Sequence, residues 1–169
     1  MENPYFKVKR LSEEAILPSK RDEDAGYDLY GIFDEDFLIL DQGDIKLVGT
    51  KLSIEISKNW VFYIAERGST GTKGISRRCG VIDSGYRGEI FIPINNTSNK
   101  KIVFYRFNDS RLDEFLNKNN LNKNEITIYP YNKAIAQGML LYTPHVEIEE
   151  VKELSNSIRG SGVIGSSNK

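Results

Sequence analysis

Apolar residues recur with a period of two along most of this chain. In the clearest case Leu52, Ile54 and Ile56 alternate with polar neighbours, which is the pattern of a strand with one buried face. Turn-forming Gly, Asn, Asp and Pro separate the runs, so we expect an all-β sandwich, jelly roll or small barrel rather than βαβ units. The runs expected to form strands are 6–11, 37–40, 44–48, 52–56, 61–65, 89–95, 102–107 and 134–142.

One segment departs from this alternation. Leu112, Phe115 and Leu116 recur at helical spacing within 109–120. This spacing predicts a short amphipathic helix, inserted into an otherwise β-rich domain.

The end of the chain differs from the rest. Glycine and serine dominate 156–169, and few residues there could pack in a core. Such a composition is typical of a mobile segment. We therefore expect one β-rich domain over 1–155 and a flexible C-terminal arm over 156–169, with no internal repeat.

Composition narrows the class of protein. The 169 residues carry 23 Lys plus Arg against 24 Asp plus Glu, with 39% hydrophobic residues, which fits one domain with a core. Charge this balanced argues against binding nucleic acid or a membrane by bulk electrostatics. The chain has neither an apolar run near the roughly 20 residues that span a bilayer nor a signal-peptide core. We therefore expect a cytoplasmic protein with no nucleic-acid or membrane partner.

Two residue types limit the possible chemistry. Cys79 is the only cysteine and His145 the only histidine, which excludes an internal disulfide and argues against a zinc site or a histidine-activated nucleophile. We expect Cys79 to be a partly buried thiol and His145 a surface residue. Any hydrolytic chemistry must then rest on carboxylates, hydroxyls, arginines or a carboxylate-held metal.

Three glycine-rich polar clusters could bind an anion. They are DAGYDLYG at 24–31, ERGSTGTKG at 66–74 and RGSGVIGSS at 159–167. Glycine lets backbone N–H groups approach a phosphate, and arginine adds bidentate charge. None has the order of a P-loop or a dinucleotide fingerprint, and each alone could be only a turn. Together they favour convergence on one polyphosphate.

A fourth cluster, GVIDSGYRGEI at 80–90, reads as a β-hairpin with Asp83 and Tyr86 near its tip. There a carboxylate could orient a water molecule, and a ring could stack on a sugar or base. An Asx turn with a surface tyrosine explains the same residues.

In this order AGYDL, RGST, GVIDSGYRGEI, AIAQ and RGSGVIGSS, which span 25–167, resemble the five motifs of the homotrimeric dUTP pyrophosphatases, the dUTPases. The resemblance implies a distorted jelly roll or β-barrel that forms a homotrimer, with active sites shared between subunits. It also implies hydrolysis of dUTP to dUMP and pyrophosphate with Mg²⁺.

The resemblance further implies roles for single residues. Asp28 would hold Mg²⁺ through water, and Asp83 would activate the attacking water. Tyr86 would stack against the deoxyribose and leave no room for a 2′-hydroxyl, while Gln137 would brace the site. The other expected substrate contacts are Arg67, Gly68, Ser69, Gly80, Val81, Ile82, Arg159, Ile164, Gly165, Ser166 and Ser167.

Three positions depart from the family pattern. Gly68 stands where a serine usually follows the arginine, so a hydroxyl contact is lost or moves to Ser69 or Thr70. Ala134 stands where a basic residue is usual, and Ile164 stands in the place of an aromatic that stacks on uracil. We expect weaker closure of the arm without loss of the chemistry.

Two alternative functions remain open. A dCTP deaminase would share the fold and similar phosphate motifs, but its catalytic glutamate would fall on Pro93, which cannot relay a proton. The other alternative is a dUTPase-fold protein whose inserted helix binds a regulatory protein partner, because 97–124 is longer than the usual connection. A tolerated surface insertion explains that length equally well.

Overall fold

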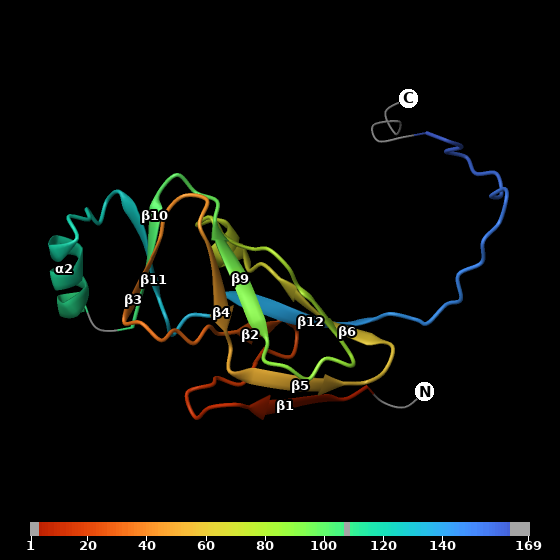
Figure 1. Cartoon of the computed structure of the whole chain (residues 1–169), viewed down its shortest axis with the longest axis horizontal. Coiled ribbons are helices and arrows are strands. Elements are labelled where there is room, and N and C mark those ends of the chain that lie inside the picture. The colour runs from red at the N-terminus through yellow and green to blue at the C-terminus, as the bar shows by residue number, and fades with distance from the viewer. Residues whose placement is uncertain (1–3, 107–108, 163–169) are drawn as a thin grey trace.

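The computed structural model describes residues 4–106 and 109–162, in which the chain forms twelve strands and two helices (Figure 1). In chain order the elements are β1 (Phe6–Arg10), β2 (Tyr27–Leu29), β3 (Phe37–Leu40), β4 (Ile45–Gly49), β5 (Leu52–Ile56), β6 (Trp60–Ala65), α1 (Gly68–Gly71), β7 (Ile75–Arg77), β8 (Val81–Asp83), β9 (Phe91–Asn96), β10 (Lys101–Tyr105), α2 (Asp109–Lys118), β11 (Ile126–Pro130) and β12 (Ala136–Tyr142). The fold is mostly β, as the alternating pattern predicts.

The strands form four small sheets, in the orders β1-β5, β11-β10-β3, β2-β12-β6-β8 and β4-β9-β7. Several neighbours are distant in the chain: β1 pairs with β5, and β2 pairs with β12. Among the described strands only β10 and β11 pair in parallel. Such long-range antiparallel pairing is typical of a jelly roll, and it can bring separate sequence motifs together.

One apolar core joins the four sheets. Ile54 of β5, Phe62 of β6, Ile92 of β9 and Phe104 of β10 are buried and belong to the same cluster, although each comes from a different sheet. Burial of an apolar side chain of this size contributes roughly 1.5–3 kcal/mol. The shared core therefore holds the sheets in fixed relative positions.

Strand β5 shows how alternation and hydrogen bonding combine. Leu52, Ile54 and Ile56 are buried, as predicted. Ser53 is buried as well, because its hydroxyl donates to the carbonyl oxygen of Arg87 at 2.7 Å. A polar residue on the other face of this strand is thus covered by the loop that follows β8.

The runs predicted to form strands leave out β2, β7 and β11. The first two have three residues each and lie beside glycines, so a period of two has no length in which to show. Strand β11 follows the polar end of the insertion and pairs with β10, Ile126 opposite Lys101. Ile126 and Ile128 do alternate with Thr127, but the run is short and directly follows the polar segment that ends the insertion.

The prediction of a β-hairpin over 80–90 is wrong. Strand β8 pairs with β6, whereas β9 pairs with β4 and β7, so the two arms enter different sheets. A turn does follow β8, where the backbone N–H of Tyr86 donates to the carbonyl oxygen of Asp83 at 3.0 Å. The arms separate because Ile90 is buried and its N–H donates to Leu52 of β5.

The predicted helix is present as α2, which ends two residues before the expected boundary at 120. Leu112 and Leu116 pack with Val103 of β10, and Phe115 stacks on Phe37 with ring centroids 4.0 Å apart. In Figure 1 the helix lies at one end of the molecule, beside β3, β10 and β11. Asn120 adopts a φ of 54°, a left-handed conformation that commonly follows the last turn of a helix.

Replacing Leu116 with alanine is expected to lower the free energy of unfolding by about 2–4 kcal/mol, because it leaves a cavity under α2. Denaturant unfolding measures this loss. The matched control is Glu114→Ala, at an exposed position of the same helix, with an expected change within about 0.5 kcal/mol. Equal losses in both variants would contradict the packing role of Leu116.

Beyond β12 the chain leaves the sheets and runs as a long arm away from them (Figure 1). Every residue from 144 to 162 is exposed, and none of them lies in a strand. His145 is exposed at the start of this arm, as expected. The domain boundary near 155 stays a prediction. In the part of the chain that the structure describes, neither helix combines the length and the apolar character needed to span a membrane.

Candidate active site

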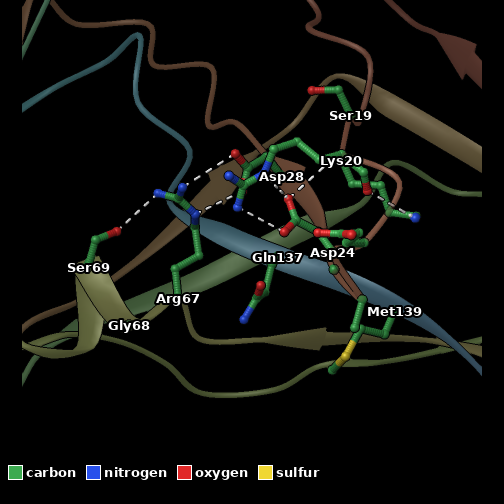
Figure 2. A pocket seen from close by; sticks show the side chains of 13 residues that line it. Ser19, Lys20, Asp24, Asp28, Arg67, Gly68, Ser69, Gln137 and Met139 are labelled. Carbon is green, nitrogen blue, oxygen red and sulfur yellow. Dashed lines mark hydrogen bonds and ion pairs between the residues drawn. The ribbon is translucent and has the colours of Figure 1, made fainter.

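A polar cavity of about 810 Å³ opens beside β2 and β12 (Figure 2). Its walls come from the loop before β2, from β2 and β12, and from the chain that follows β6. The lining residues are Ser19, Lys20, Arg21, Glu23, Asp24, Ala25, Gly26, Asp28, Arg67, Gly68, Ser69, Gln137 and Met139.

Strand register brings the predicted residues of this cavity together. Strand β12 lies between β2 and β6, and Gln137 pairs with Asp28 on one side and with Ala65 on the other. Arg67 follows Ala65 by two residues. Three segments that are far apart in the sequence therefore meet at one point of the sheet.

Arg67 and Asp28 form a two-point ion pair. The Nε of Arg67 lies 2.9 Å from Oδ1 of Asp28, and Nη2 donates to Oδ2 at 3.3 Å. About a third of each side chain is exposed, 27% for Arg67 and 34% for Asp28. The pair is thus fixed in geometry and still reachable from the cavity.

The remaining side of the guanidinium is held as well. Nη1 of Arg67 donates to Oγ of Ser69 and to the carbonyl oxygen of Ala134, both at 3.1 Å. The hydroxyl of Tyr129 donates to the same carbonyl at 2.7 Å. Burial raises the pKa of Tyr129, which extends to higher pH the range over which this hydroxyl can donate. Figure 2 shows the line of contacts from Ser69 through Arg67 to Asp28.

Gln137 contacts both neighbouring segments. Its Nε2 donates to the carbonyl oxygen of Glu66 at 2.7 Å. Its Oε1 lies so close to Gly26 that a Cβ added there would be 2.6 Å away. A side chain at position 26 would therefore displace Gln137 from its present position.

The predicted residues at 80–83 and Tyr86 lie elsewhere. Strand β8 is the opposite edge of the β2-β12-β6-β8 sheet, and none of these residues lines the cavity. Asp83 and Tyr86 are exposed, and Val81 is 64% exposed. One chain thus brings together Asp28, the 67–69 segment and Gln137, and holds the third predicted motif at a distance from them.

The predicted contacts in the arm are only partly described. Arg159 is exposed on the arm beyond β12. Ile164, Gly165, Ser166 and Ser167 lie outside the described residues.

The family model described as dUTPase matches residues 12–106, which is more than half of the chain. The chain belongs to the dUTPase family. A deoxyuridine 5′-triphosphate nucleotidohydrolase of Nautilia profundicola is 34% identical over 168 residues, covering 97% of this chain and 99% of the relative.

Two solved dUTPases share the fold. The dUTPase of Staphylococcus bacteriophage 80alpha with dUPNHPP is 24% identical, with a TM-score of 0.75, and the match covers 98% of this chain and 99% of that one. A mutant dUTPase of S. aureus phage phi11, described with the coordination of a structural Mg(II) ion, is 19% identical, with a TM-score of 0.65 over 90% of this chain and 99% of that one. The predicted dUTPase-like jelly roll is thereby confirmed.

Two departures from the dUTPase pattern can be located. Gly68 begins α1, is exposed and leaves open space where a side chain would be. The neighbouring hydroxyl of Ser69 faces Arg67, whereas Thr70 is buried and donates to the carbonyl oxygen of Arg67 at 3.0 Å. Ala134 is buried and presents its carbonyl, not a charge, to Arg67.

The sequence motifs do not predict that the loop before β2 belongs to the site. The charged run SKRDED, which directly precedes AGYDL, is the signal that could have indicated it. Ser19 pairs with Asp28 in an isolated antiparallel bridge, which places Lys20 at the cavity. Arg21 is paired with Asp24 at 2.8 Å. Lys20 reaches only the carbonyl oxygens of Arg21 and Asp22, at 3.3 and 3.5 Å, and the ring of Tyr27. Among the described cavity cations, Lys20 is the one with no ion pair within 4.0 Å, although, after the hydrogen bond from Arg21, its charge helps to lower the pKa of Asp24.

The expectation of a partly buried Cys79 is wrong. Cys79 is exposed in the loop between β7 and β8, outside both strands.

The described residues contain no group of three or more His, Cys, Asp or Glu side chains that could hold a metal ion. In the cavity Asp28 offers a carboxylate that is already engaged by Arg67. Glu23 and Asp24 also line the cavity, and Asp24 is paired with Arg21. A site that offers one or two carboxylates suits a hydrated Mg²⁺, which keeps several of its waters when it binds with substrate phosphates.

Proposed function

We propose that this dUTPase hydrolyses dUTP to dUMP and pyrophosphate, with a water molecule activated by Asp83 attacking in line and Mg²⁺ bound to the triphosphate. The observation that carries the proposal is the Arg67 guanidinium, held by Asp28, Ser69 and Ala134 at the wall of an open polar cavity. Relatives named deoxyuridine 5′-triphosphate nucleotidohydrolase support the same reaction.

Arg67 and Ser69 would contact the phosphates, and the backbone of Gly68 leaves room for their approach. Lys20, which forms no ion pair within 4.0 Å among the described residues, would add a charge on the same wall. Phosphoryl chemistry depends on charge neutralisation and alignment more than on covalent catalysis. These residues therefore suffice without histidine or cysteine.

Asp28 would hold Mg²⁺ through water, and Gln137 would keep Asp28 and Arg67 in register. When bound, the metal would neutralise negative charge on the triphosphate. The dUPNHPP of the phage 80alpha dUTPase and the Mg(II) ion of the phage phi11 dUTPase belong to those proteins, and they are consistent with this arrangement.

We infer a homotrimer with shared active sites. Asp83 and Tyr86 lie on the opposite sheet edge from the cavity, so a complete site needs them from a second subunit. The backbone of Gly80, Val81 and Ile82 would pair with the uracil edge there. A neighbouring subunit's arm would close the site through Arg159, Ile164, Gly165, Ser166 and Ser167.

The exposed arm beyond β12 supports such closure, since residues 144–162 make no buried contact with their own domain. An arm ordered by its ligand would exclude water from the reaction. Ile164 would cover the uracil without stacking on it.

The purified protein with Mg²⁺ is expected to hydrolyse dUTP at least about 100-fold more efficiently than UTP, because Tyr86 leaves no room for a 2′-hydroxyl. Turnover of dTTP and dCTP should also be far slower. Release of pyrophosphate from each nucleotide measures the preference. Similar kcat/KM values for dUTP and UTP would contradict the role of Tyr86.

The alternative of dCTP deamination has no support here. Pro93 lies in β9 opposite Leu47, where it offers no carboxylate, and both the matching family model and the Nautilia profundicola relative are dUTPases. A protein partner at α2 stays a prediction. Leu112 and Leu116 of this helix are buried within the chain, and the half-buried Phe115 stacks on Phe37. This packing fits a tolerated insertion equally well.

A further inference from the structure

Gly88, in the segment YRGE at 86–89, lies directly against Tyr86 and has no role in the proposed function. We propose that Gly88 determines the preference for deoxyribose over ribose, by leaving the space in which the Tyr86 phenol is held. The inference rests on the proposed function, in which Tyr86 faces the sugar.

The Tyr86 ring folds back over its own turn. Its hydroxyl donates to the carbonyl oxygen of Glu89 at 2.7 Å. The backbone N–H of the same residue donates to Asp83 at 3.0 Å. Both ends of Tyr86 are therefore tied to the chain around the turn.

A side chain at 88 would collide with this ring. A Cβ added to Gly88 would lie 2.6 Å from Oη, 2.8 Å from Cζ and 3.3 Å from Cε2 of Tyr86, and these are its three nearest neighbours. Gly88 is not among the residues with positive φ. Its backbone would accept alanine, so the phenol alone requires glycine here.

The carbonyl that receives the phenol is itself anchored. The carboxylate of Glu89, 16% exposed, accepts a hydrogen bond from the backbone N–H of Lys51 at 3.0 Å and lies 3.8 Å from its Nζ. The next residue, Ile90, is buried and bonded to Leu52. The acceptor of the phenol hydrogen bond thus belongs to the rigid part of the domain.

The ring nevertheless remains open to a ligand, since Tyr86 is 41% exposed. An exposed tyrosine without such a contact would exchange between rotamers. A ring held at one position can act as a wall that rejects one extra hydroxyl, whereas a mobile ring yields to it. Gly88 therefore acts through Tyr86, as a positioning residue.

Gly88→Ala is the direct test, and Gly85→Ala in the same turn is its matched control, because a Cβ at Gly85 meets nothing within 4 Å. We expect Gly88→Ala to lower the ratio of kcat/KM for dUTP to that for UTP by about tenfold or more. Gly85→Ala should leave this ratio within about twofold of wild type. Both variants should have melting temperatures close to that of wild type. In Gly88→Ala the displaced tip of the Tyr86 ring can move into solvent, and in Gly85→Ala the added methyl group displaces nothing.

Repeating the Gly88→Ala substitution in a Tyr86→Ala variant separates a role through Tyr86 from a general structural role. In Tyr86→Ala, adding Gly88→Ala should not change the ratio further, because the ring it displaces is gone. Tyr86→Phe, which keeps the ring but loses the hydrogen bond to Glu89, should lower the ratio in the same direction.

Three results would overturn the proposal. An unchanged ratio in Gly88→Ala would refute the role of Gly88 alone, while Tyr86 keeps its own. A further fall in the Tyr86→Ala background would show that Gly88 acts by another route. An unchanged ratio in Tyr86→Ala itself would remove the sugar contact of the proposed function, and the role of Gly88 with it.

Discussion

Asp83→Asn is expected to lower the rate of dUTP hydrolysis by about two or more orders of magnitude, the usual scale for loss of a positioned general base. An amide can still hydrogen-bond the attacking water but cannot take its proton. Asp83 is exposed at the end of β8, so the substitution leaves the core intact. Single-turnover kinetics measures the chemical step, and binding of a non-hydrolysable dUTP analogue should change little. A wild-type single-turnover rate would exclude Asp83 as the base.

Hybrids of the proposed homotrimer provide a control for this prediction and test whether the sites are shared. Neither Asp83→Asn nor Arg67→Met should be active alone, but one hybrid site can combine the intact Arg67 of one subunit with the intact Asp83 of another. Co-refolding equal amounts should recover about a quarter of wild-type activity, if subunits assemble at random. No recovery would place both residues in the same subunit's site.

Removing residues 159–169 is expected to leave a folded protein and to lower kcat/KM for dUTP by about 100-fold or more. The fold should survive because the buried core residues lie between Ala15 and Ala136 and the described part of the removed segment is exposed. The activity should fall because Arg159, Ser166 and Ser167 no longer reach the terminal phosphates. Thermal unfolding and steady-state kinetics measure the two effects.

The point variant Arg159→Met in the full-length chain separates the charge from the rest of the arm. We expect it to lose part of the activity that truncation removes, since the serines and the cover over the base remain. Full activity in the truncated protein would show that the arm is only a linker.

The sequence predicts strands well where apolar residues alternate, as in β5, or run continuously, as in β3, over four or more positions. Strand β3 has the expected bounds, Phe37–Leu40, and β5 has the expected Leu52–Ile56. Prediction from the sequence fails at β2 and β7, which have three residues each. It also fails at the expected hairpin, because the partners of β8 and β9 belong to different sheets. Local patterns report which face of a strand is buried, but they do not report which strand lies beside it.

The sequence by itself determined which chemical groups the site would use. Asp28, Arg67 and Asp83 stand in ordered motifs whose chemistry needs no tertiary information. Only the tertiary structure decided that Gln137 brings the first two together and that β8 holds the third at the far edge of the sheet. It also placed Lys20 in the cavity and the Tyr86 phenol over Gly88. The physical reason is that sheet order and close backbone approach arise from long-range pairing around a shared core, which no single segment of the sequence contains.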